Sequence, residues 1–217
     1  MNLYPTITWV SVATPGYEGD LARLTASTRH LGADHRFIFH RTDRNELWYL
    51  TRKFEFLRRG FDNCRTTHLF WIDADCEIVA PFTARDIAGT KPLTAVRHFG
   101  STGPKNYLPP KYHARLGNTG AISWQSCLFG GTVDAMAAQL ERLQWMDAEG
   151  ETYDEHGLVI DWSQRVDDVL TLPCRWVAPT CFDKFPVEYR ARFNERAEGL
   201  PVVVHHNRAL NPGQARG

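Results

Sequence analysis

The sequence predicts an α/β fold in which a mixed, mostly parallel sheet is flanked by helices. Short runs of β-branched and aromatic residues alternate with segments whose apolar residues recur at helical spacing. This order of elements is typical of parallel sheets with crossover helices. The chain has 217 residues, of which 43% are hydrophobic and 23% are charged, and these values suit one globular domain with an ordinary core.

The first forty residues contain the clearest β-α-β unit. Residues 6–14, "TITWVSVAT", predict a buried strand that stops before Pro15 and Gly16. Residues 18–32 place leucines at helical spacing and predict a helix, and residues 35–42 predict a second strand. Two strands joined by a helix within this length indicate a parallel pair.

The remaining elements are predicted in the same alternating order. A helix over 45–61 carries an apolar stripe and leads into the strand "THLFWID". Residues from about 97 to 125 are rich in Gly, Pro, Asn and Tyr and predict a long loop, which in a compact domain is usually functional. The later elements are a strand over 121–131, a helix over 133–150, a turn and helix over 151–167, and extended pieces over 169–173, 175–179 and 201–206.

The composition argues against several classes of protein. The 25 basic and 25 acidic residues cancel without a long block of one sign, which gives no support to nucleic-acid binding. The five cysteines form no C-x-x-C pair and leave one over, so neither a zinc site nor a disulfide framework is indicated. Residues 1–16 show neither a transmembrane segment nor a signal peptide. A reducing compartment is therefore expected.

A strand that otherwise suits burial ends in acidic residues. "HLFWIDADCEIV", residues 68–79, places Asp73, Asp75 and Glu77 close together. Ligands of parallel α/β sheets bind outside the carboxyl ends of the strands, and alternation in an extended segment would point Asp73 and Asp75 to the same side. Two such carboxylates repel each other unless a positive charge lies between them, and hard oxygen ligands suit magnesium or manganese. The pattern predicts a divalent metal site.

Two other interpretations of this strand end remain open. The carboxylates also match a solvated strand end or a helix cap, because short acidic motifs occur often by chance. Aspartyl-phosphate phosphatases place D-x-D-x-T/V at the end of a strand, but here Glu77 stands at the fifth position, and their strand normally opens the chain. The buried strand before Asp73 favours the metal site over both.

A second acidic segment follows a predicted helix. "GETYDEHGLVIDW", residues 150–162, contains Asp154 and Glu155. Acidic residues are common at helix starts, where they accept free backbone N–H groups, and this alternative explains the segment taken alone. The strand before the helix ends in Gly130 and Gly131, which permit a ligand to approach the backbone closely. This order suggests that the glycines and the acidic segment face the metal site.

Taken in order, these motifs resemble the retaining glycosyltransferases of the GT-A fold, and most closely family 6, the group of the blood-group A and B transferases and the α1,3-galactosyltransferases. The order and spacing agree over roughly residues 50 to 212. The resemblance implies a single GT-A, Rossmann-like domain over 1–217, with a nucleotide- and metal-binding half (1–95), a donor-sugar and acceptor half (96–205) and a tail (206–217). The matching segments are "KFEFL", "LFWIDADCEIV", "YLPP", "LFGGTVDAM", "YDEHGL", "LPCRWVAPTCFD" and "VVVHHNRALNP".

The resemblance also implies a role for each site residue. Asp73 and Asp75 would hold manganese, or magnesium, and the diphosphate of a UDP-sugar, with His206 as a candidate third metal ligand. Glu155 would act as the nucleophile or stabilise an oxocarbenium ion beneath the anomeric carbon, and Asp154 would hold a sugar hydroxyl. The other donor contacts are Val12, Ala13, Thr14, Tyr17, Lys53, Asp73 and Arg208 for the nucleotide, and Gln125, Ser126, Cys127, Gly130 and Gly131 for the sugar.

The sequence departs from the family pattern at two places. Tyr153 stands where the family has His, and His156-Gly157 replaces a Ser-His pair that helps to bind the acceptor. Val204 and Leu210 stand where the family places basic residues that close over the diphosphate. The first departure leaves the identity of the acceptor open. At the second, Arg208 or His206 would take the place of the basic residues that close over the diphosphate.

The expected function is metal-dependent, retaining transfer of galactose or N-acetylgalactosamine from a UDP-sugar to a glycan or lipid-linked glycan acceptor. Another GT-A transferase, a nucleotidyltransferase and a non-catalytic sugar-binding module remain as alternatives. Mutually repelling carboxylates argue against the last of these, because a pure binder does not need them. Without a predicted membrane anchor, we expect a bacterial or viral cytoplasmic enzyme, at most peripheral to a membrane.

Overall fold

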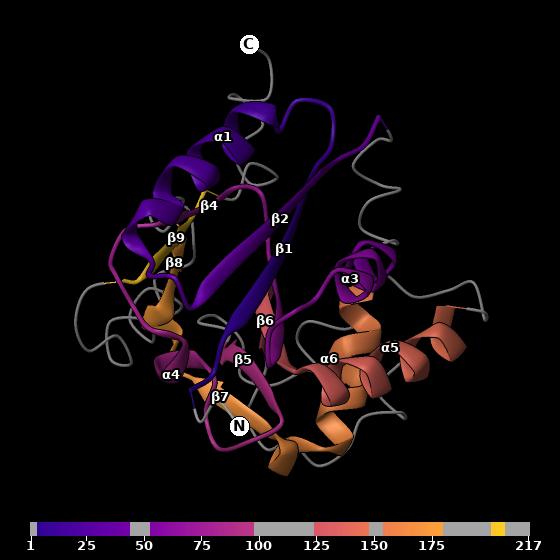
Figure 1. Ribbon diagram of the computed structural model, residues 1–217. Coiled ribbons are helices and arrows are strands. Elements are labelled where there is room, and N and C mark those ends of the chain that lie inside the picture. Colours follow the sequence, from indigo (N-terminus) through magenta and orange to yellow (C-terminus); the bar gives the residue numbers. More distant parts are fainter. Residues whose placement is uncertain (1–3, 44–52, 98–123, 148–153, 180–200, 207–217) are drawn as a thin grey trace, which may run out of the picture.

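The central sheet has six strands in the order β2-β1-β3-β6-β5-β7 (Figure 1). β1, β2 and β3 run parallel to one another and β7 is parallel to β5, whereas β6 is antiparallel to both of its neighbours. The strands are β1 (Ile7–Ala13), β2 (His35–Arg41), β3 (His68–Ile72), β5 (Leu93–Arg97), β6 (Trp124–Thr132) and β7 (Val169–Leu172). The computed structural model describes residues 4–43, 53–97, 124–147, 154–179 and 201–206.

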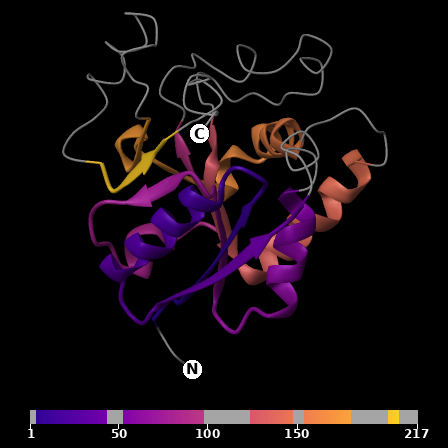
Figure 2. The same ribbon diagram turned by 90° about the horizontal axis from the view of Figure 1, so that it is seen from above.

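Helices cover both faces of this sheet. α1 (Glu18–Ser27) and the short α4 (Ala84–Ile87) lie on one face, and α3 (Lys53–Asp62), α5 (Val133–Asp147) and α6 (Asp154–Gln164) lie on the other (Figures 1 and 2). Because both faces are covered, β1 is buried at all seven of its positions. No helix in the described part of the chain is long and apolar enough to cross a membrane.

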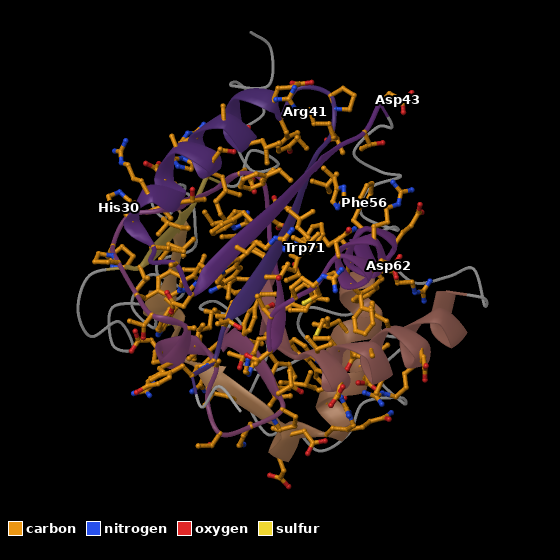
Figure 3. All side chains as sticks on the ribbon, in the orientation of Figure 1. His30, Arg41, Asp43, Phe56, Asp62 and Trp71 are labelled. Atoms are coloured by element: carbon orange, nitrogen blue, oxygen red, sulfur yellow. The ribbon has the colours of Figure 1, made fainter. Side chains whose placement is uncertain are left out.

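Alternate side chains of the central strands enter two hydrophobic clusters. In β3, Trp71 packs on the face covered by α3, while Phe70 and Ile72 pack on the face covered by α1, as the period of two in a strand requires. Figure 3 shows Trp71 deep in the molecule. Full burial of such a side chain stabilises the fold by about 1.5–3 kcal/mol. The strand that leads to the acidic motif is therefore held firmly from both faces.

A second, three-stranded sheet lies beside the α1 face and has the order β4-β9-β8. β4 (Cys76–Ile78) follows the acidic turn directly, and β9 (Val203–His205) pairs with it in the antiparallel sense. β8 (Val177–Pro179) runs parallel to β9 on its other edge. This sheet brings a late segment of the chain next to the end of β3.

Most predicted elements are confirmed among the described residues, and the expected α/β class is correct. The helix predicted over 45–61 is described from Lys53 onward, and most of the loop predicted over 97–125 lies outside the described residues. The first helix ends earlier than predicted, because residues 28–30 form a 3-10 turn. β4, α4, β5 and the pairing of the second sheet were not predicted. Short 3-10 turns also occupy Val166–Asp168 and Cys174–Trp176.

Candidate active site

The acidic motif begins where β3 ends, and the chain turns at that point. β3 ends at Ile72, and the backbone N–H of Cys76 donates to the carbonyl oxygen of Asp73 at 3.0 Å, which closes a tight turn over Ala74 and Asp75. The expectation of an extended segment from Asp73 to Asp75 is therefore wrong. Because the backbone bends between Asp73 and Asp75, the alternation of side chains in a strand does not determine the directions of their carboxylates. Each carboxylate has its own partners.

Asp73 interacts with residues of the α3 side of the sheet. The Lys53 ammonium lies 3.0 Å from Asp73 Oδ1, and the indole N–H of Trp71 donates to the same oxygen at 2.6 Å. Lys53 is the first residue of α3 and only 2% exposed, with its ammonium also 5.6 Å from the centre of the Trp71 ring. A buried ammonium needs such a partner, since removing it from water is costly.

Asp75 interacts with the second sheet instead. Its Oδ1 lies 3.2 Å from His205 Nε2. Burial alone would raise the pKa of Asp75, but the hydrogen bond and charge of His205, with a contribution from Lys53, lower it. Burial alone would lower the pKa of His205, but Cys127 and Asp75 raise it well above its usual value. The two side chains thus form an ion pair at neutral pH.

The neighbouring histidine, His206, has a different partner. Its Nε2 lies 3.0 Å from Glu77 Oε2, while its backbone N–H donates to the carbonyl oxygen of Asp75 at 2.9 Å. His206 was the predicted third metal ligand, but the imidazole beside Asp75 belongs to His205. The correction follows from the antiparallel pairing of β4 and β9, which sets His205 opposite Cys76 at the end of the acidic turn.

The predicted nucleotide-binding residues of the first strand lie at the same edge of the sheet. Val10 pairs with Trp71, so Val12 and Ala13 are level with the start of the acidic turn. Beyond Ala13 the chain turns back, with the N–H of Tyr17 donating to the Thr14 carbonyl oxygen at 3.0 Å. The end of β1 and the end of β3 thus form one continuous rim.

The turn after β1 requires a glycine. Gly16 has φ of +90°, a backbone conformation that residues with a Cβ rarely adopt. Its N–H donates to Glu18 Oε2 at 2.9 Å, which ties the turn to the first residue of α1. Figure 3 shows Arg41, the last residue of the adjacent strand β2, and Asp43 just past its end. The three parallel strands therefore present their carboxyl ends together.

The predicted donor-sugar residues on β6 separate into two groups. Cys127 lies at the carboxyl edge, where its carbonyl oxygen accepts the N–H of Asp73 at 2.9 Å. The Gln125 amide is buried and donates to the carbonyl oxygen of Arg97 at 3.1 Å. Ser126 lies between them and is half-buried. These three residues therefore lie along the stretch of β6 that meets the acidic turn.

Gly130 and Gly131 belong to the other group, and their expected place at the site is wrong. They pair with Phe70 and Leu69, toward the start of β3 and away from its carboxyl end. A Cβ on Gly130 would lie 2.4 Å from the Phe70 ring, and one on Gly131 would lie 2.3 Å from the carbonyl oxygen of Pro92. The glycines allow close packing in the middle of the sheet and do not serve a ligand at its edge.

Three predicted residues are not tested by side-chain geometry. Asp154 and Glu155 are the first two residues of α6, and their side chains lie outside the described part of the structure. This position fits the alternative that acidic residues favour the start of a helix. Arg208 also lies outside the described residues. The proposed roles of all three stay predictions.

The residues at the acidic turn fit a divalent ion. Asp75, Cys76 and His205 each offer one ligand atom, and these atoms lie within 4.8 Å of one another. A carboxylate oxygen and an imidazole nitrogen suit manganese, with Asp73 as a further oxygen donor from the same turn. Manganese prefers oxygen and nitrogen to sulfur, so the Cys76 thiol, whose pKa burial raises well above its usual value, is not assigned to it.

Comparison with known proteins adds information about the fold. The sequence has no match among protein-family models or curated proteins. Its structure is similar to the apo structure of WbbM, described as a bifunctional glycosyltransferase, with a TM-score of 0.67 and 12% sequence identity over 95% of this chain. The two structures therefore share a mixed α/β fold. It spans 46% of the length of WbbM, and at this identity the likeness concerns the fold alone.

His205 and Cys76 are site residues that the sequence motifs did not identify. "VVVHH" offered two adjacent histidines, and the resemblance pointed to the second of them. Alternation would have separated the two, because adjacent residues of an extended segment point to opposite faces of the sheet. The pairing of β9 with β4 was the missing information, and neither segment carries a signal for it.

Proposed function

We propose that this protein is a metal-dependent glycosyltransferase that transfers galactose or N-acetylgalactosamine from a UDP-sugar, with retention of configuration, as in the family 6 enzymes that it resembles. One observation carries the proposal. At the rim formed by β1 and β3, the turn of Asp73 and Asp75 meets a buried lysine and a histidine. The similarity to WbbM, itself a glycosyltransferase, supports the same class of reaction.

The acidic turn is the proposed site for metal and diphosphate. Asp75 and His205, with Asp73, would hold manganese or magnesium, which when bound neutralises charge that builds on the leaving diphosphate. Lys53 is fixed 3.0 Å from Asp73 Oδ1, so it orients that carboxylate and adds positive charge near the phosphates. The adjacent end of β1 is placed to receive the uridine.

The transfer exchanges one bond at the anomeric carbon for another. The bond between C1 and the diphosphate oxygen breaks, a bond from C1 to an acceptor hydroxyl oxygen forms, and the hydroxyl proton leaves with the diphosphate. Positive charge develops at C1, and Glu155 would stabilise it or attack it from beneath. Asp154 would hold a hydroxyl of the donor sugar, and the acceptor would be a glycan or a lipid-linked glycan.

The metal assignment can be tested by thermal unfolding of the purified protein. Manganese and UDP together should raise the melting temperature more than either alone, because a ligand that binds only the folded state stabilises it. Asp75→Asn should lose this joint effect. Asp62→Asn, on the exposed side of α3, is the matched control and should retain it. Full retention by Asp75→Asn would contradict the assignment.

The reaction can be tested with the two donors separately. UDP-galactose or UDP-N-acetylgalactosamine should be hydrolysed slowly with manganese, and EDTA should stop the reaction. The anomeric configuration of the first-formed product, followed by NMR, should match that of the donor. Glu155→Gln should lose the reaction while Glu141→Gln, an exposed position on α5, keeps it. UDP-sugar binding without hydrolysis or transfer would favour the nucleotidyltransferase or sugar-binding alternatives.

A further inference from the structure

Two buried cysteines, Cys76 and Cys127, lie behind the Asp75–His205 pair, and no bond of the proposed transfer is made or broken at either thiol. Cys76 opens β4 and stands opposite His205 on β9, so their side chains share one face of the small sheet. Cys127 comes from β6 of the main sheet; its Sγ lies 3.4 Å from Gln125 Oε1, and its thiol is close enough to Cys76 and His205 to affect the pKa of each. Three separate strands therefore bring sulfur and nitrogen atoms into one neighbourhood.

These groups make a mixed set of ligands. Asp75, Cys76 and His205 offer an oxygen, a sulfur and a nitrogen within 4.8 Å of one another, and Cys127 adds a second sulfur beside two of them. Two ligands each about 2.0–2.1 Å from a tetrahedral ion lie ~3.3 Å apart. The distance from Asp75 Oδ1 to His205 Nε2 is 3.2 Å, which matches that spacing.

The chemistry of the set differs from that of the acidic turn alone. Manganese and magnesium prefer oxygen, whereas two sulfurs and an imidazole favour zinc over them. A single buried cysteine behaves as a small apolar residue, but here two lie beside a histidine and a carboxylate. Cys76 is 0% and Cys127 2% exposed, while the Asp75 and His205 side chains are 11% and 16% exposed. An ion can therefore reach the thiols from the Asp75 side.

We propose that Asp75, Cys76, Cys127 and His205 form a binding site for a thiophilic divalent ion such as zinc. Binding would replace protons: the proton on His205 and the thiol protons leave to solvent as the metal bonds form. The absence of a C-x-x-C pair argued against zinc in the sequence, but strand pairing joins cysteines that are far apart in the chain. Since the site includes Asp75, zinc would exclude manganese and inhibit transfer. This inhibition rests on the proposed function, whereas zinc binding does not.

The test uses cobalt as a spectroscopic substitute for zinc, on reduced, metal-free protein. We expect one equivalent of cobalt to produce the near-ultraviolet charge-transfer absorption of a cobalt–thiolate bond, and zinc to remove it. Cys127→Ser should weaken that absorption. Cys64→Ser is the matched control, since Cys64 is half-buried next to Thr66 and away from the site, and should leave it unchanged.

A second variant covers the risk that Cys127→Ser does not fold. Asp75→Asn keeps both thiols, so it should keep the charge-transfer absorption but bind cobalt at least about tenfold more weakly, a loss typical even for partners of metal ligands. No charge-transfer absorption in the unaltered protein, or unchanged cobalt affinity in Asp75→Asn, would overturn the site.

The same samples separate the two proposals. Manganese and UDP are left out of the cobalt titration, so its result does not depend on transfer activity. Cobalt–thiolate absorption without a joint effect of manganese and UDP on the melting temperature would contradict the proposed function and leave the zinc site standing. If the joint effect is present, zinc should abolish it in the unaltered protein, and failure to do so would overturn the inhibition.

Discussion

Asp73 and Asp75 are two residues apart, yet their surroundings differ in kind. Asp73 is held by Lys53 and by the indole of Trp71, both buried in the main sheet and its helix. Asp75 is held by His205, whose imidazole is partly exposed and belongs to the small sheet. The charge of His205 depends on a proton whose pKa Cys127 and Asp75 raise well above its usual value, so His205 stays charged at neutral pH unless a ligand displaces that proton.

The difference between these partners suggests that Asp73 and Asp75 have different roles within one short motif. The partners of Asp73 are permanent, so this carboxylate is a fixed part of the fold as well as a candidate ligand. If a metal ion binds at Asp75 as proposed, it would displace the proton that His205 carries. We therefore expect substitutions on the Asp73 side to affect mainly stability, and substitutions on the Asp75 side to affect mainly metal binding.

The largest effect should come from Asp73→Asn. This change removes the carboxylate 3.0 Å from the Lys53 ammonium, which is 2% exposed, and should lower the free energy of unfolding by about 3–5 kcal/mol. Urea denaturation measures the loss. Lys53→Met added to Asp73→Asn should recover much of it, because the buried charge that lost the Asp73 carboxylate is then removed. A double variant as unstable as Asp73→Asn alone would contradict the view that Asp73 stabilises the fold by compensating the Lys53 charge.

Trp71→Phe should have the next largest effect. It removes an N–H that donates to a charged oxygen at 2.6 Å, and the expected loss in unfolding free energy is about 2 kcal/mol. Trp124→Phe is the matched control, because the Trp124 indole donates to the neutral Thr171 hydroxyl at 3.1 Å and should cost about 1 kcal/mol. Both variants should keep the joint effect of manganese and UDP. If only Trp71→Phe loses the joint effect of manganese and UDP on the melting temperature, Asp73 would contribute more to metal binding than we expect.

Asp75→Asn should cost less stability than either of these changes on the Asp73 side. His205 can lose its proton when its carboxylate partner is removed, so no charge is stranded, and we expect a loss of about 1 kcal/mol. Urea denaturation on the same samples used for the manganese test gives both quantities at once. A loss as large as that of Asp73→Asn would show that the two carboxylates are equally structural.

The smallest expected effect is the pH dependence of the free energy of unfolding that comes from His35, whose surroundings differ from those of His205. Burial lowers the pKa of His35 from 6.5, although Asp34, the Phe82 backbone and Asp86 act to raise it. The Nδ1 of His35 accepts the indole N–H of Trp9 at 2.9 Å. The unfolded chain then binds more protons, so the free energy of unfolding should fall as the pH drops below 6.5.

His35→Asn should reduce this acid sensitivity, since an amide oxygen can accept the same N–H without titrating. Denaturation curves at several pH values measure the slope. His40 and His68 also have lowered pKa values caused by burial, so part of the slope should remain. A slope unchanged by His35→Asn would contradict the assignment to this residue.

Much of the main sheet could be predicted from the sequence because its strands and helices carry strong periodic signals. β1 and β3 are buried runs that end at a turn or an acidic motif, and the pattern fixes them without tertiary information. β4 and β9 are three residues each, too short to show a period. Their existence depends on pairing with each other, which only the folded chain supplies.

The site was predictable where it follows directly from β1 and β3, and less so elsewhere. Asp73 and Asp75 follow β3 at the carboxyl edge of the sheet, and Lys53, at the start of α3, lies at the same edge, 3.0 Å from Asp73 Oδ1. The choice of His205 over His206 depends on the register of β9. Gly130 was assigned to a ligand because a glycine looks the same in sequence whether it makes room for a substrate or for the Phe70 ring.

The pairing of β9 with β4 also affects how the protein is made. His205 is far along the chain from Asp75, and all six strands of the main sheet precede it. During synthesis the large sheet can therefore assemble before its acidic turn acquires a histidine, and contacts of such long sequence separation form late. Formation of the Asp75–His205 pair would then show that the last strand has docked, and a chain stopped before residue 203 would fold in its larger part without that pair.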